Sequence, residues 1–85
     1  MSYRVKLHPR VAKFIARAEP KLRERIQKRL LLAAEDPHRH LETLAGQDLR
    51  KLRIGTYRAL IDLDEEAHIL WVRHLDHRKR IYRRD

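Results

Sequence analysis

The spacing of the apolar residues changes once along the chain, and that change limits the possible folds more than any other feature. Between Val11 and Ala33, apolar residues recur at the three- and four-residue intervals of an amphipathic helix. Prolines at positions 20 and 37 interrupt this pattern, and a helix does not readily run through a proline. The pattern therefore predicts two consecutive helices joined by a very short turn, which together form a helical hairpin.

Runs of strand character lie on both sides of this hairpin. YRVKL, at residues 3–7, alternates apolar and charged side chains as a half-buried strand does. The stretch DPHRHLETLAGQD has loop composition, and three further runs follow it, LRKLRI, YRALIDL and HILWVRHL. Turn signals at residues 54–56 and 64–66 separate these runs, and connections this short join antiparallel neighbours. We therefore predict an α+β fold of order β-α-α-β-β-β, with the helical hairpin packed on one face of an antiparallel sheet.

Length and composition restrict what can hold this fold together. A chain of 85 residues buries roughly 60 to 65% of its unfolded surface, so we expect residues 1–85 to form a single domain. There is no cysteine, which excludes a disulfide framework and a thiolate zinc site. The opening MSYRVKLHPR lacks an apolar signal region, and no stretch approaches the roughly 20 apolar residues of a membrane span. We therefore expect a cytoplasmic, soluble protein.

Positive charge is the strongest global signal. Lys and Arg number 21 against 12 Asp and Glu, which gives a net charge of +9, and most of the cations are arginines. Guanidinium groups bind phosphate through two parallel hydrogen bonds and stack on bases, so the composition favours a nucleic acid as partner. Two alternatives stay open, because surface ion-pair networks and an acidic protein partner are also compatible with an excess of cations.

Alternation along the later strands assigns some of these cations to one face. If Leu52 and Ile54 face the helices, Lys51 and Arg53 share the opposite, exposed face, and the next strand adds Arg58. An amphipathic sheet also exposes cations simply because one of its faces is solvated. The pattern alone therefore does not separate a binding site from ordinary surface.

Motifs of the common hydrolases and phosphotransferases are absent. The chain has no G-x-S-x-G, no H-E-x-x-H, no catalytic order of Ser, His and Asp, and only two glycines for a phosphate-binding loop. Four histidines, His38, His40, His74 and His77, lack a carboxylate at metal-ligand spacing, so we expect neither a metal nor a cofactor. His77 is a candidate acid or base, since imidazole exchanges protons near neutral pH.

A cluster of cations with a tyrosine suits one reaction in particular, the cleavage of RNA by its own 2′-hydroxyl. That reaction needs a proton acceptor, stabilisation of a pentacovalent phosphorane and a proton for the leaving 5′-oxygen, and cations supply the second directly. A lysine or tyrosine held among cations can act as the base, because its deprotonated form is favoured there. Arg78 and Tyr82, four residues apart after the last strand, would lie near the same edge. The rings of Tyr57, Trp71 and Tyr82 could stack on bases.

Two stretches resemble a known family. LAGQDLRKLRIGTYRALIDLD resembles the L-x-G and R-x-G-x-Y-R of the RelE/ParE-type toxins of toxin–antitoxin systems, and LWVRHLDHRKRIYRR resembles their H-R-x-x-x-Y ending. The resemblance covers essentially the whole chain in length and element order. It implies a RelE-like mRNA interferase, a ribosome-dependent endoribonuclease that cuts mRNA in the A site and is neutralised by a cognate antitoxin.

The resemblance also implies roles for individual residues. The implied catalytic residues are Arg58, which stabilises the phosphate, together with Lys51, Arg78 and Tyr82. The residues expected to contact the mRNA or the 16S rRNA of the ribosome are Arg50, Arg53, Arg73, His77 and Arg80. Leu49 stands where some relatives have a lysine that acts as general base, so Lys51, His77 or Tyr82 must take that role. The ParE branch of the same fold inhibits DNA gyrase without cleaving RNA, and this is the alternative function.

Overall fold

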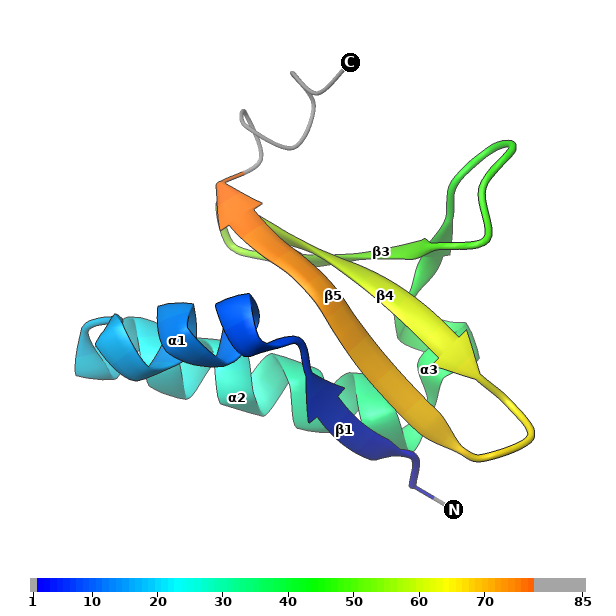
Figure 1. Ribbon diagram of the computed structural model, residues 1–85, viewed down its shortest axis with the longest axis horizontal. Helices are drawn as coiled ribbons and strands as arrows, with labels where there is room; N and C mark the ends of the chain where they lie inside the picture. Colours follow the sequence, from blue (N-terminus) through cyan, green and yellow to red (C-terminus); the bar gives the residue numbers. More distant parts are fainter. Residues whose placement is uncertain (1, 78–85) are drawn as a thin grey trace.

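The structure is a computed structural model that describes residues 2–77, in which three helices accompany a five-stranded sheet (Figure 1). The strands are β1 (Arg4–Leu7), β2 (Glu42–Thr43), β3 (Arg50–Ile54), β4 (Tyr57–Asp64) and β5 (Ile69–His77), and the helices are α1 (Pro9–Arg17), α2 (Pro20–Glu35) and α3 (Pro37–His40). The α+β fold and the helical hairpin predicted from the sequence are confirmed. The stretch predicted as a loop, residues 36–48, contains the single turn α3 and the two-residue strand β2.

The strands lie in the order β1-β5-β4-β3-β2, so β4 is the central strand. Strands β3 to β5 are antiparallel neighbours, as their short connections predict, and β2, which lies in the predicted loop, adds a further antiparallel pair with β3. β1 instead runs parallel to β5, which differs from the antiparallel sheet expected. The helices and three strands separate β1 from β5 in the chain, so no short turn dictates their relative direction. Parallel pairing places Val5 beside Leu70 and Leu7 beside Val72, in contact with one common core.

Both long helices pack on one face of the sheet (Figure 1). On this face the strands present Leu52, Ile54, Ala59 and Ile61, each at most 1% exposed, and this is the alternation predicted from the sequence. The helices contribute Val11, Ile15, Ile26, Leu30, Ala33 and Ala34 to the same core. Within the described residues, no helix covers the opposite face of the sheet, and none is long and apolar enough to cross a membrane.

A β-bulge interrupts the pairing of β4 with β5 at Arg73, which has no residue directly opposite it on β4. Before the bulge, Val72 is buried on the helix-facing side. After the bulge the alternation is shifted by one residue, so that Leu75 is buried there. His77, two residues after Leu75, therefore lies on the helix-facing side as well.

The turn between α1 and α2 is held by one side chain of α2. The Arg23 guanidinium donates hydrogen bonds from Nε to the carbonyl of Ile15 (3.2 Å) and from Nη2 to the carbonyls of Ala16 (3.2 Å) and Ala18 (2.9 Å). These carbonyls lie at the C-terminal end of α1, where a helix lacks backbone donors of its own. Arg23 therefore caps α1 and links the two helices of the hairpin.

We predict that Arg23→Ala lowers the free energy of unfolding by about 1–3 kcal/mol, because it removes a charged donor from three carbonyls. Urea unfolding followed by circular dichroism measures this change. Lys21→Ala removes an exposed cation from the same helix and is the matched control, with an expected change below about 0.5 kcal/mol. Equal effects of the two substitutions would contradict the capping role of Arg23.

Candidate nucleic-acid interface

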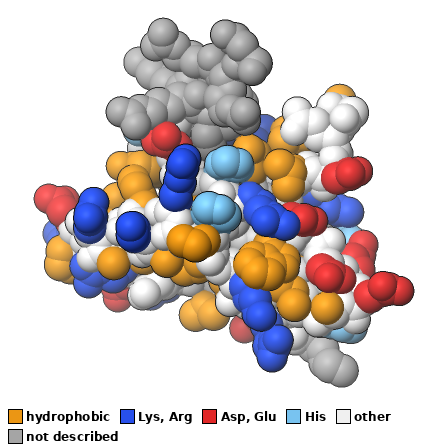
Figure 2. Space-filling view, viewed as in Figure 1, with side chains coloured by type: hydrophobic (Ala, Val, Ile, Leu, Met, Phe, Trp, Pro, Cys, Tyr) orange, Lys and Arg blue, Asp and Glu red, His pale blue; other side chains and the backbone are white. Residues whose placement is uncertain are grey.

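The face of the sheet opposite the helices carries cations on several strands. Lys51 and Arg53 on β3 and Arg58 on β4 alternate with residues buried under the helices. On β5, Trp71 and Arg73 lie on the same side. We call the surface formed by Lys51, Arg53, Arg58, Trp71 and Arg73 the open face. Figure 2 shows Lys and Arg side chains interleaved with hydrophobic ones over the strands.

Arg58 lies at the centre of the open face, yet it is only 5% exposed. The expectation that Arg58 is exposed is therefore wrong: Arg58 is buried on the central strand, β4, which has a neighbouring strand on each side. Directly opposite Arg58 lie Arg53 on β3 and Asp76 on β5. Side chains opposite one another in a sheet have Cβ atoms about 4.5–5.5 Å apart, so the cation of Arg58 is placed beside a carboxylate. A nearby acid offsets part of the desolvation that burial imposes on a guanidinium.

A carboxylate from the edge strand β2 holds the two cations of β3. Glu42 Oε1 lies 3.3 Å from Nζ of Lys51, and its Oε2 lies 3.7 Å from Nε of Arg53. The Lys51 side chain is 13% exposed and that of Arg53 is 61% exposed. Nothing in the sequence pattern marks Glu42, since it lies in the predicted loop and only the pairing of β2 with β3 brings it beside Lys51.

Two residues expected to contact RNA lie on the other side of the sheet. His77 follows the bulge onto the helix-facing side, where its ring meets Tyr57 edge-on at a centroid distance of 5.6 Å. Arg50 alternates with the outward-facing Lys51 and so also points to the helix-facing side. The structure thus brings Lys51, Arg53 and Arg58 together on the open face and separates Arg50 and His77 from them. Three expected site residues lie outside the described residues: Arg78, Arg80 and Tyr82.

Arg50 lies near a polar cluster at the end of the sheet where β4 turns into β5. There, His38 Nε2 and Glu65 Oε1 are 2.8 Å apart, and Tyr3 also hydrogen-bonds Glu65. The hydrogen bond with His38 is the main cause that lowers the pKa of Glu65 below its usual 4.5, and the charge of Arg50 adds to the effect. Desolvation, followed by the charge of Glu65, raises the pKa of Tyr3. In residues 2–77, neither this cluster nor any other groups three or more His, Asp or Glu side chains that could hold a metal ion.

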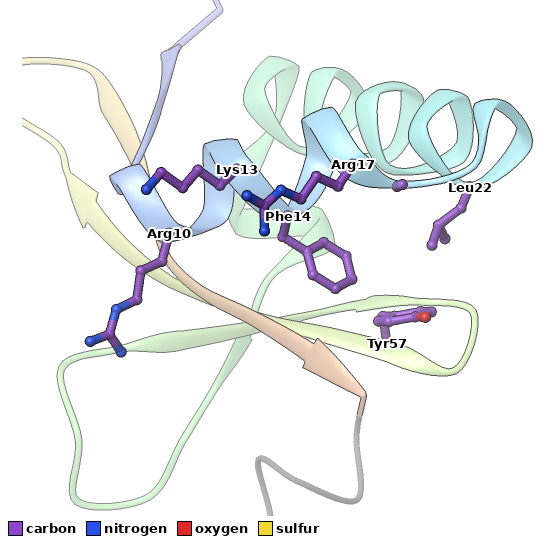
Figure 3. A pocket seen from close by; sticks show the side chains of 7 residues that line it. Arg10, Lys13, Phe14, Arg17, Leu22 and Tyr57 are labelled. Carbon is purple, nitrogen blue, oxygen red and sulfur yellow. The ribbon is translucent and has the colours of Figure 1, made fainter.

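On the helix side, α1 and the start of β4 form a shallow pocket of about 490 Å³ (Figure 3). Phe14 points toward Tyr57, and their ring centroids are 5.7 Å apart. Arg10, Lys13 and Arg17 line the pocket at helical spacing along α1. Helical periodicity places these cations on the solvent side of a helix and gives no sign of a pocket. The pocket arises only when the folded sheet brings Tyr57 next to α1. The pocket is a second basic surface, separate from the open face.

The sequence matches a family model over residues 5–82, which is nearly the whole chain. The family is described as the ParE toxin of the type II toxin–antitoxin system parDE. The chain belongs to the ParE toxin family. The resemblance to RelE/ParE-type toxins is thereby confirmed, and this ParE family member is a toxin of a type II toxin–antitoxin system. No curated protein matches it in sequence.

Solved RelE structures share the fold of this ParE family toxin. The RelBE2 toxin–antitoxin complex from Mycobacterium tuberculosis superposes with a TM-score of 0.80 at 20% identity, covering 91% of this chain and 92% of that chain. The isolated RelE toxin of E. coli gives 0.76 at 19% identity, with coverage of 89% and 84%. The archaeal RelE–RelB complex from Pyrococcus horikoshii gives 0.74 at 24% identity, with coverage of 94% and 99%. Likeness at these identities establishes the fold and does not by itself assign an activity.

We predict that part of the acid sensitivity of this ParE family toxin comes from Glu65. Its pKa is lowered by folding, so the stability that it contributes is complete above its ordinary pKa of 4.5 and is lost as the pH falls through the lowered value. Between about pH 6 and pH 3, the melting temperature of the wild type should fall further than that of Glu65→Gln. Glu66→Gln, which removes the adjacent carboxylate, is the control and should follow the wild type. Identical pH profiles for Glu65→Gln and the wild type would contradict this role.

Proposed function

We propose that this toxin is a ribosome-dependent endoribonuclease that cuts mRNA in the ribosomal A site. The proposal is carried by the position of Arg58, which lies opposite Arg53 and Asp76 and shares the open face with Lys51. Its place of action is the cytoplasm, where ribosomes translate mRNA. Its protein partner is a cognate antitoxin, and the solved RelE structures that share its fold support this partner because they include complexes with RelB antitoxins.

In the proposed reaction, the 2′-oxygen of the RNA attacks the adjacent phosphorus, a pentacovalent phosphorane forms and the 5′-oxygen leaves. Arg58 and Arg53 stabilise the negative charge on the phosphorane oxygens, since a guanidinium offers two parallel donors to a phosphate. The neighbouring strands restrict the Arg58 side chain before RNA binds, and donors fixed in advance stabilise developing charge without reorganising. Arg78 and Tyr82 complete the proposed catalytic set on the basis of the family resemblance.

Lys51 is the candidate base on the open face. It lies diagonally across from Arg58 in the ladder of β3 and β4, a step that places the two residues roughly 7–8 Å apart. A lysine accepts a proton only as the neutral amine, and the carboxylate of Glu42, 3.3 Å from its Nζ, favours the charged form. For Lys51 to act as the base, this ion pair has to separate when RNA binds. His77 is disfavoured as the base because it lies beside Tyr57 on the helix-facing side.

Inhibition of DNA gyrase is the second candidate function, and the match to the ParE family model favours it. The two candidates differ in their products, which are cuts in translated mRNA or gyrase-linked breaks in DNA. Expressing the toxin without its antitoxin, followed by primer extension on translated mRNA and recovery of gyrase-linked DNA, separates them. DNA breaks without mRNA cuts would replace the first proposal by the second.

We predict that Arg58→Ala lowers the rate of mRNA cleavage by about 10²–10³-fold, the usual loss when one preorganised donor to a transition state is removed. Arg58→Lys retains the charge but not the two parallel donors, so it should restore only part of the rate. Arg17→Ala removes the same charge from α1 and is the matched control, which should cut mRNA like the wild type. Quantitative primer extension on translating ribosomes measures all three.

Burial of Arg58 makes a parallel stability measurement necessary. Thermal unfolding of each variant shows whether a lost activity reflects a lost fold, and Arg58→Lys retains most of the side-chain volume. A folded Arg58 variant that cuts mRNA as fast as the wild type would contradict the catalytic role of this arginine.

A further inference from the structure

Trp71 lies on the open face rather than in the core. Its neighbours along β5, Leu70 and Val72, are fully buried under the helices, whereas Trp71 is partly exposed on the opposite side. It is the single tryptophan of the chain. The indole is therefore not part of the hydrophobic core. Packing against the helices does not explain why position 71 has so large an aromatic side chain.

Two cations lie over the indole ring. Lys6 of β1 pairs directly with Trp71 and places its Nζ 5.6 Å from the centroid of the indole ring. Arg73, at the bulge, places its Cζ 5.3 Å from the same ring. Asp62, opposite Trp71 on β4, accepts a hydrogen bond of 3.2 Å from Nη2 of Arg73. The Arg73 guanidinium thus lies between the carboxylate of Asp62 and the indole ring. The four residues come from three strands, β1, β4 and β5.

This group lies on the same side of the sheet as Arg58. Asp76, which lies opposite Arg58, is five residues from Trp71 along β5, a distance of roughly 16 Å at the rise of a strand. One RNA strand lying along β5 can therefore contact both Trp71 and Arg58. Acidic side chains gather around the β4–β5 turn beyond Trp71 (Figure 2). They would repel phosphates and so limit how far an RNA strand extends along β5 in that direction.

We propose that Trp71, Lys6 and Arg73 form a second RNA contact, at which an unpaired base takes the place of the cations over the indole ring while Lys6 and Arg73 turn to bind the flanking phosphates. Every base has a planar π face, and aromatic rings beside cations hold single-stranded nucleic acid in many proteins. The inference rests on the proposed ribonuclease function and adds to it a base-stacking site away from the scissile phosphate. An acidic peptide fits less well, because it would pair with the cations but offer the indole no planar partner.

Because Trp71 is the single tryptophan, the intrinsic fluorescence of the protein measures binding at this site directly. The full-length toxin is titrated with single-stranded 2′-O-methyl RNA, which cannot be cleaved through its 2′-oxygen, and the indole fluorescence is followed. We expect saturable quenching by this RNA and little quenching by an abasic oligonucleotide of equal length or by polyglutamate. Absent quenching, or equal quenching by the RNA and the abasic strand, would overturn the stacking site. Quenching by polyglutamate alone would identify an acidic-peptide surface instead.

Fluorescence anisotropy of labelled RNA measures the affinity of each variant and so distinguishes base stacking on Trp71 from a purely structural role of this residue. Trp71→Leu should weaken binding roughly 5- to 150-fold, the range for loss of one stacked base, whereas Trp71→Phe should keep most of the affinity. Lys6→Ala should reduce the salt dependence by about one phosphate contact. A folded Trp71→Leu variant with unchanged affinity would overturn the proposal, and thermal unfolding identifies variants that have lost their fold.

This site and the ribonuclease function can fail independently. If the wild type cuts translated mRNA while Trp71→Leu binds RNA normally, the stacking site is overturned and the ribonuclease function stands. If RNA quenches Trp71 saturably while no cuts in mRNA occur, the stacking site is supported and the ribonuclease function is overturned.

Discussion

Packing of the helices on only one face of the sheet is the constraint on which both the fold and the candidate interface depend. Successive side chains of a strand point to opposite faces, so burying Ala59 and Ile61 under the helices directs Arg58 to the other side. The same rule in β3 directs Lys51 and Arg53 outward. A one-residue slip in either strand would place cations in the core, which makes the register of these strands strongly specified. The packing that stabilises the fold is thus the packing that positions the open face.

The open face is not a uniform layer of positive charge. Each group of cations has a carboxylate beside it: Glu42 for Lys51 and Arg53, Asp62 for Arg73, and Asp76 opposite Arg58. These acids reduce the long-range attraction for a polyanion, but they also fix the directions of the donors before a ligand arrives. Fixed donors are what stabilisation of a transition state requires. Attraction over longer distances can come from the rest of the net charge of +9.

The parts of the structure that follow from local patterns could be predicted, and those that depend on strand order could not. Helical spacing and alternation predict the helical hairpin and the inward and outward sides of β3 and β4. The position of Arg58 on the central strand follows from the strand order, which no local pattern determines. The bulge at Arg73 arises from pairing between strands, and it moves His77 to the helix-facing side. The contact of Glu42 with Lys51 and Arg53 could not be predicted either, because it depends on the pairing of β2 with β3.

Chemical-shift mapping by NMR tests most directly the central claim that RNA meets the open face. Isotope-labelled toxin is titrated with an uncleavable 2′-O-methyl RNA, and the backbone amide resonances are followed. The open face predicts shifts at residues 51–53, 58 and 71–73, with α1 residues 9–17 unchanged. Shifts confined to α1 and Tyr57 would contradict the claim, because they would place the RNA in the pocket on the helix side.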